Sequence, residues 1–118
     1  MTVHLVLFRP RADLTTDQRA ALASSFEAAL RAIPAIRQAR VGRRVLTGRP
    51  YEAMMRADYP YAAVIEFADA DGLRAYLDHA AHHELAARIL ESFADALIYD
   101  SELQEGAAAL ASLLADTH

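Results

Sequence analysis

The sequence contains no cysteine among its 118 residues. That absence excludes disulfide bonds, thiolate nucleophiles and cysteine-ligated zinc, and it is compatible with a cytoplasmic protein. Glycine is scarce too, with only four residues, and none of them belongs to a glycine-rich loop of the kind that holds phosphate groups. Any site chemistry therefore has to come from other side chains.

Long apolar runs and positive charge are also missing. No apolar run approaches the ~18 residues that a membrane-spanning helix needs. The N-terminus has no basic stretch ahead of its apolar residues, so we expect no secretory signal. The formal net charge is −4, which gives no electrostatic footprint for phosphate backbones. We therefore expect a cytoplasmic protein with neither nucleic acid nor membrane as partner. Five arginines that cluster locally are interpreted as a solvated face: Arg37, Arg40, Arg43, Arg44 and Arg49.

Four segments have the composition of β-strands, rich in β-branched and aromatic residues. They are 3–8, 38–46, 61–67 and 96–100. The segment 47–60 contains glycine and two prolines, which predicts a loop, with a short helical turn at 52–56 as a further option.

Between these strands, apolar residues recur at the spacing that is typical of helices. Thr15 and Gln18 match a capping box. The apolar residues of 22–33 recur at intervals of three and four and predict a helix, which Pro34 ends. The other predicted helices are a short one capped by Asp69 or Asp71, a second piece from about His82, and a C-terminal helix over 107–114.

The order βαββαβ predicts one α+β domain with a ferredoxin-like antiparallel sheet, helices on one face and an extra C-terminal helix. Leu5, Val6, Leu7 and Phe8 are apolar at consecutive positions, so both faces of that strand are expected to be buried. The chain has too few helices to cover both faces. A second subunit placed sheet against sheet covers the other one, which predicts a homodimer.

Three stretches of the chain resemble one known family. Residues 4–8 resemble its opening strand, a histidine followed by an aliphatic run and an aromatic, and 61–69 resemble its third strand. Residues 73–85 resemble its most specific segment, a tyrosine followed by a His-Pro-Ala-His box. The family is the stress-responsive A/B barrel domain, and the resemblance extends over about 3–103.

The resemblance implies a dimeric α+β barrel, in which two ferredoxin-like sheets pack back to back and each subunit keeps a pocket between its sheet and helices. Residues 1–103 are then the barrel domain and 104–118 a C-terminal helical tail. Members of known activity include plant cyclases that fold linear polyketides by aldol-type condensation and a plant hydroxynitrile lyase. For this chain the resemblance implies a small apolar ligand and no cofactor.

The same resemblance indicates the candidate site. In the cyclase, the pocket tyrosine and the second histidine of the box are the acid–base pair, and these match Tyr76 and His82, the candidate catalytic residues. The opening-strand histidine matches His4, and Tyr61 stands where the cyclase has a further pocket histidine. Together with His79, the first histidine of the box, these two are the candidate substrate-binding residues.

The residues themselves leave two interpretations of the pair open. A histidine with a pKa near neutral can remove a proton α to a carbonyl, and a phenol within reach can stabilise the enolate oxygen. Alternatively, Tyr76 is a core aromatic and His82 caps or orients the helix that begins there. His4 is likewise either a hydrogen-bonded core residue or part of the pocket lining.

A metal site is the third option for this segment. His79, His82 and His83, with Asp78 and Glu84, are residue types that ligate zinc or iron, and His79 and His83 have i, i+4 spacing. However, no HExxH pattern is present and the box is expected to span a helix break. We therefore expect no metal site.

Two classes of function remain at the level of the sequence. The first is a non-catalytic dimer that binds a small molecule or has a structural role in stress. The second is a cofactor-independent enzyme, cyclase-like or lyase-like, that acts on a small apolar carbonyl compound. In the enzyme His82 is the base and Tyr76 the acid or oxyanion donor.

Two further segments have open roles. The loop 47–60 either closes over the pocket or packs at the surface or at the dimer contact. The tail helix lacks basic residues and is expected to pack on the dimer.

Overall fold

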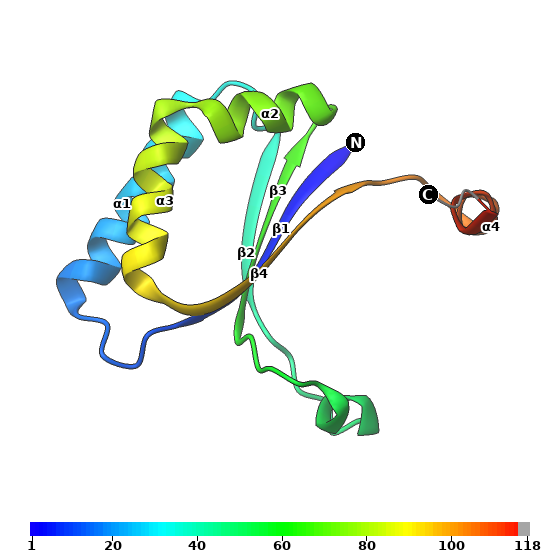
Figure 1. Ribbon diagram of the computed structural model, residues 1–118, viewed down its shortest axis with the longest axis horizontal. Coiled ribbons are helices and arrows are strands. Elements are labelled where there is room, and N and C mark those ends of the chain that lie inside the picture. Colours follow the sequence, from blue (N-terminus) through cyan, green and yellow to red (C-terminus); the bar gives the residue numbers. More distant parts are fainter. Residues whose placement is uncertain (116–118) are drawn as a thin grey trace.

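A computed structural model describes residues 1–115 of the chain, so the last three residues of the predicted tail lie outside the described residues. It shows one four-stranded antiparallel sheet with helices α1, α2 and α3 over one face (Figure 1). The predicted ferredoxin-like fold with an additional C-terminal helix is confirmed. The elements in chain order are β1 (Thr2–Pro10), α1 (Thr16–Ala32), β2 (Gln38–Arg43), the 3-10 helix η1 (Pro50–Met54), β3 (Tyr61–Phe67), α2 (Ala70–Asp78), α3 (Ala80–Ser92), β4 (Phe93–Glu102) and α4 (Ala107–Ala115).

The strand order in the sheet is β2-β3-β1-β4, so the first strand of the chain lies between the last two. All three neighbouring pairs are antiparallel. The register places His4 of β1 opposite Ile65 of β3 on one side and Asp100 of β4 on the other. These three residues lie in one row across the sheet.

Three predicted strands have different limits in the structure. β1 is longer than the predicted 3–8 and includes Pro10 as its last residue. The other two are β2 and β4. The prediction of 38–46 was too long, because β2 ends at Arg43, which pairs with Tyr61, the first residue of β3. The prediction of 96–100 was too short, because β4 continues in both directions alongside β1. In both cases the length of the neighbouring strand, and not the local composition, fixes the end.

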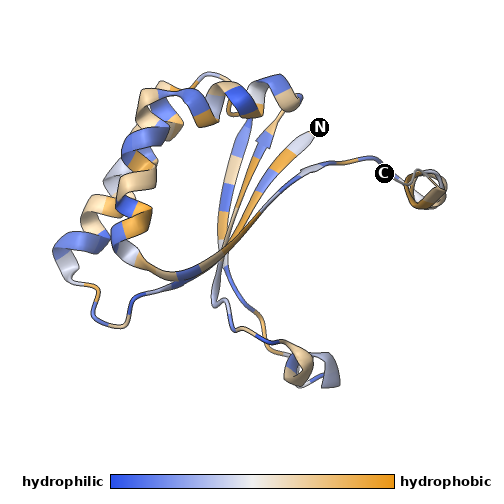
Figure 2. Ribbon diagram, viewed as in Figure 1, coloured by the Kyte–Doolittle hydropathy of each residue, from blue (hydrophilic) through white to orange (hydrophobic). Residues whose placement is uncertain are grey.

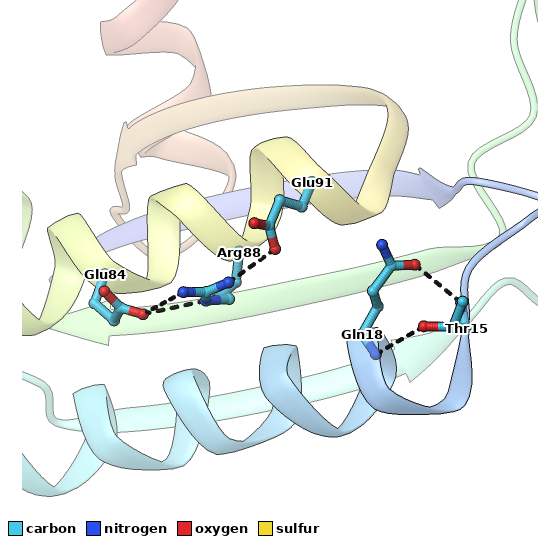
Figure 3. Close-up of polar contacts among 5 residues, drawn as sticks. All are labelled: Thr15, Gln18, Glu84, Arg88 and Glu91. Carbon is cyan, nitrogen blue, oxygen red and sulfur yellow. Dashed lines mark hydrogen bonds and ion pairs between the residues drawn. The ribbon is translucent and has the colours of Figure 1, made fainter.

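The helix caps follow the sequence more closely. Thr15 Oγ1 accepts a hydrogen bond from the Gln18 backbone N–H at 3.1 Å, and Gln18 Oε1 accepts one from the Thr15 N–H at 3.0 Å (Figure 3). This is the predicted capping box, and it satisfies two of the backbone donors that every helix start leaves free. Asp69 caps α2 in the same way, accepting from the Gly72 N–H at 2.9 Å.

On α3, Arg88 joins two acidic residues of the same helix. Its guanidinium donates to Glu84, one turn earlier, at 3.0 and 3.1 Å, and to Glu91 at 2.9 Å (Figure 3). This chain of charges marks the solvent side of α3. The apolar side, with Leu85 buried, faces the core.

The core lies between the sheet and the three helices. Phe67 and Ile65 of β3 are buried against α1 and α2, with Tyr76 of α2 among the residues in contact with them. The remaining buried members are Ala29 and Ile33 of α1, Leu73 of α2 and Leu85 of α3. Ile65 and Phe67 stand at alternate positions of β3, so both side chains point to the same, helix-covered face of the sheet.

The other face of the sheet has no helix over it in the described chain. The ring of His4 meets Tyr76 of α2, so Leu5 and Leu7, at the alternate positions of β1, point away from the helices. Of the apolar side chains that β1 carries on this side, Val3 is buried, whereas Leu5 and Leu7 are only half-buried. No helix of the described residues lies over this side of the sheet (Figure 2). We call this surface the open face; its exposed and half-buried apolar residues are Leu5, Leu7, Ala62, Val64, Leu97 and Tyr99.

The arginines of the predicted solvated face lie at the surface. Arg40 pairs with Glu66 at 2.9 Å, and Arg44 pairs with Asp58 at 2.7 Å. Both ion pairs include at least one exposed residue, so they contribute little to stability. None of the helices in residues 1–115 is long and apolar enough to cross a bilayer.

Two segments project from the domain on the side of the open face: the segment around η1 and helix α4 (Figure 1). The radius of gyration is 16.2 Å. A compact domain of this length has a radius of gyration of about 13.5 Å. The difference reflects these two projections, which extend beyond the layered core.

Candidate functional site

The site begins with His4, buried in the central strand of the sheet. Its side chain points toward the helices and contacts the ring of Tyr76, with ring centroids 5.6 Å apart. On the neighbouring strand, the Asp100 carboxylate accepts a hydrogen bond from His4 Nδ1 at 2.6 Å. This contact fixes the orientation of the imidazole, so that Nε2 is directed away from β4.

Tyr76 lies at the centre of the group. It is buried on the inner side of α2, and its ring packs on Phe67 at 5.3 Å and on the ring of His82 at 4.6 Å. Burial, with the Asp100 carboxylate as a second cause, raises the pKa of Tyr76 to about 12. The hydroxyl therefore keeps its proton at neutral pH and can act as a hydrogen-bond donor.

His82 comes from the first turn of α3. Burial, and next the proximity of His4, lower the pKa of His82 below its usual value, while the Leu77 carbonyl acts in the opposite direction. The imidazole is therefore neutral at neutral pH. Its Nδ1 is buried and has no hydrogen-bond partner within the described residues. Leaving such an atom unpaired costs about 1–3 kcal/mol.

His79 is the residue that caps the second helix, a role that the sequence analysis had considered for His82. It ends α2 and caps α3, because its Nδ1 accepts a hydrogen bond from the Ala81 N–H at 3.0 Å. The second helix therefore begins at Ala80 and not at about His82, which corrects that prediction. The short link between the two helices brings His82 beside Tyr76.

Tyr61 is not part of this group. It is the first residue of β3 and pairs with Phe8, whereas Ile65, four residues further on, pairs with His4. At about 3.3 Å per residue, this separates Tyr61 from the row of His4 by about 13 Å. Its ring stacks on Phe8 at 5.6 Å. The structure thus brings together three of the five candidate residues, His4, Tyr76 and His82.

Asp100 is the member that the sequence analysis missed. It lies in the predicted fourth strand, but a single acidic residue at a strand end carries no distinctive signal. Only the strand order, which places β4 beside β1, brings its carboxylate to His4. The sequence itself shows only an acidic residue within a predicted strand, which is too common a feature to indicate a site.

The group of His4, Tyr76, His82 and Asp100, called the site cluster below, lies apart from two shallow surface hollows. One of about 470 Å³ is lined by residues that include Arg37 and Glu66, and one of about 590 Å³ by residues that include Arg11 and Glu91. Neither hollow is lined by a histidine or a tyrosine. We therefore place the candidate site at the cluster, where Tyr76 and His82, two groups whose pKa values are shifted mainly by burial, meet.

The histidine-rich segment 78–84 is divided between the end of α2 and the start of α3. Within residues 1–115, no three histidine or carboxylate side chains gather closely enough to hold a metal ion. The i, i+4 relation of His79 and His83 spans the helix start, as the sequence had indicated.

Fold and site together define a class: ferredoxin-like α+β domains with one helix-covered sheet face, one open face and a buried histidine–tyrosine group. The family can be stated as well. The chain belongs to the stress-responsive A/B barrel domain family, whose sequence profile matches residues 2–103. Helix α4 begins beyond the last matched residue.

Solved structures with this fold come from bacteria and plants. A dimeric ferredoxin-like protein of unknown function from Thermobifida fusca is 26% identical over 86% of this chain and 90% of its own, with a TM-score of 0.65. A protein from Arabidopsis thaliana is 17% identical over 91% and 99%, with a TM-score of 0.73. The hydroxynitrile lyase of Passiflora edulis is 15% identical over 89% and 94%, with a TM-score of 0.72. Among curated proteins, none matches the chain.

Proposed function

We propose that the protein acts as a homodimer that binds a small, largely apolar molecule at the site cluster through a carbonyl or similar polar group. The observation that carries the proposal is the buried, unpaired Nδ1 of His82 beside the Tyr76 ring. A neutral imidazole and a phenol that keeps its proton are a matched pair for one polar group of a ligand. Phe67 and the surrounding core supply apolar contacts.

The homodimer is supported by two observations. The open face exposes apolar side chains along the central strand and its neighbours, and monomeric proteins rarely leave such a surface in water. The Thermobifida fusca protein, which shares this fold at 26% identity, is a dimer. A second copy on the open face would cover these side chains without disturbing the site cluster on the other side of the sheet.

Ligand retention tests the proposal. Wild-type protein, His82→Ala and Tyr76→Phe are each incubated with a metabolite extract and re-isolated, and the retained compounds are compared by mass spectrometry. We expect the wild type to retain a compound that both variants retain about tenfold less, because each variant removes one hydrogen bond to a buried group. Leu90→Ala, on the solvent side of α3, is the matched control. Equal retention by all four proteins, or none by any, would contradict the proposal.

The pH dependence of retention follows from His82. Because the pKa of His82 lies below the usual value of about 6.5, most of the imidazole is neutral between pH 8 and that value, and retention should change little there. As the pH falls through the lowered pKa, the ring gains a proton and retention should decrease. Stability should fall in the same direction, because below about pH 6.5 the unfolded chain binds a proton that the folded chain does not. Retention in His82→Gln should lack the acidic decrease.

A cofactor-independent enzyme is the second candidate, favoured by the same neutral imidazole. His82 would take a proton from the carbon next to a carbonyl, and the Tyr76 hydroxyl would donate a hydrogen bond to the enolate oxygen that forms. The hydroxynitrile lyase of Passiflora edulis has this fold, which is compatible with such chemistry but does not assign it.

The same extract distinguishes the two candidates. If the protein is an enzyme, the wild type consumes a compound in the extract. His82→Ala should consume the same compound about 10²–10⁴-fold more slowly, because the variant lacks the base. A binder returns the retained compound unchanged. The dimer should persist in His82→Ala by analytical ultracentrifugation, and undiminished consumption by that variant would remove His82 from the mechanism.

A further inference from the structure

Helix α4 lies outside the family match and packs closely on no other element of the described residues. Its nine residues are alanine, leucine and serine only. The three leucines are 48–71% exposed, and α4 is not among the elements that pack closely on one another. Those leucines are Leu110, Leu113 and Leu114.

A helix of this kind needs a covering surface. Isolated helices shorter than about 12–15 residues are marginal in water, because their stability comes mainly from packing of an apolar face. α4 also has no acidic residue in its first turn and no basic residue in its last, so charge–dipole stabilisation is missing. The contacts that hold it as a helix are therefore expected from outside the subunit.

The segment around η1 presents a second apolar surface of the same kind. We call residues 45–55 the η1 segment; its large apolar side chains are between 54% and 78% exposed. These are Val45, Leu46, Tyr51, Met54 and Met55. Methionine side chains adapt readily to the shape of an apolar partner.

The η1 segment and α4 both lie near the open face. Both stand on the open side of the sheet, beyond different ends of it (Figure 1). Exposed apolar residues also lead along β4 toward α4: Leu97 and Tyr99 stand at alternate positions of the strand, and Leu103 follows its last residue. The open face, the η1 segment and α4 thus border one region, which a second copy would occupy.

We propose that α4 of one copy packs against the η1 segment of a second copy, as an arm exchanged in both directions. A two-fold axis that runs parallel to the sheet, in front of the open face and between the two projections, carries each α4 toward the partner's η1 segment. The inference rests on the proposed homodimer and adds a contact outside the family's matched residues. A membrane surface is a poorer partner, because residues 103–115 contain no lysine or arginine to attract anionic lipid.

Cysteine cross-linking tests the contact directly, since the chain has no cysteine of its own. Leu113→Cys and Met54→Cys are prepared as separately tagged full-length proteins, mixed to exchange subunits and exposed to a mild oxidant. We expect a disulfide bond in most of the heterodimers that the exchange forms. The control pairs Leu113→Cys with Leu90→Cys, whose position on α3 is equally exposed but lies on the helix-covered side. It should give little product.

Dimer affinity provides the second measurement. In the full chain, Leu113→Glu with Leu114→Glu should raise the dimer dissociation constant about tenfold or more by sedimentation, because two leucines per arm can no longer be buried. Leu90→Glu should leave it unchanged. A dimer with unchanged affinity and no Leu113–Met54 disulfide overturns the arm but keeps the homodimer; a chain that stays monomeric overturns both. Binding of wild type, but not of the double variant, to phosphatidylcholine–phosphatidylglycerol vesicles, with dimer affinity unaltered, would assign α4 to a lipid surface instead.

Discussion

Replacing Phe67 by alanine is expected to lower the free energy of unfolding by about 3–5 kcal/mol, as for other large-to-small changes in packed cores. Phe67 is 0% exposed and is the last residue of β3. Its ring contacts Tyr76 at 5.3 Å, so it joins the sheet to α2. Truncation to alanine removes that contact and leaves a cavity at the junction. Urea denaturation followed by circular dichroism measures the loss.

The matched control for this prediction is Leu90→Ala. Leu90 is 81% exposed on α3, so its truncation should change the free energy of unfolding by less than about 0.5 kcal/mol. Both variants need the same protein concentration, because a dimer links stability to concentration. A loss below about 1 kcal/mol for Phe67→Ala would mean that the core can collapse around the missing ring.

Leu7→Glu is expected to weaken self-association strongly while leaving the subunit folded. Leu7 is in the central strand and faces the open side, between Ala62 of β3 and Leu97 of β4. In a sheet-to-sheet dimer, a glutamate there would be an unpaired charge inside the interface, which costs several kcal/mol. Each 1.4 kcal/mol is tenfold in affinity, so the dissociation constant should rise by about 10³-fold. Sedimentation equilibrium over a dilution series gives this constant.

Leu90→Glu again serves as the control, since it adds the same charge on the helix-covered side of the molecule. It should dimerise like the wild type. Circular dichroism should show unchanged helix and strand content in both variants. If Leu7→Glu dimerises as tightly as Leu90→Glu, the open face is not the dimer contact and another surface must be sought.

Local signals were sufficient for much of the fold. The capping box of Thr15 and Gln18 and the stop at Pro34 depend on residues a few positions apart, and each has the predicted effect. The strand 61–67 was also predicted with its observed limits. The ends of β2 and β4 were wrong, because the neighbouring strand sets them. Val45 and Leu46 suggested more strand, yet their apolar character has no role within the subunit.

The candidate site was predictable to the extent that it depends on sequence spacing. Tyr76 and His82 lie six residues apart, and the helix break between them makes them neighbours. His4 joins them as the resemblance implied. Asp100 and Tyr61 could not be placed from sequence spacing. The register of the strands brings Asp100 to the cluster and keeps Tyr61 away from it, and that register depends on which strands pair.

The single residue that separates α2 from α3 makes the chain length between Tyr76 and His82 critical. His79 ends one helix and caps the next, so the two helices have no flexible linker that could accommodate an added residue. An insertion there would rotate α3 by about 100° about its axis and move the His82 ring off Tyr76. Ala80 is exposed, so its identity can vary freely. Relatives that keep this site should thus tolerate substitutions but no insertions or deletions between the tyrosine and the second histidine.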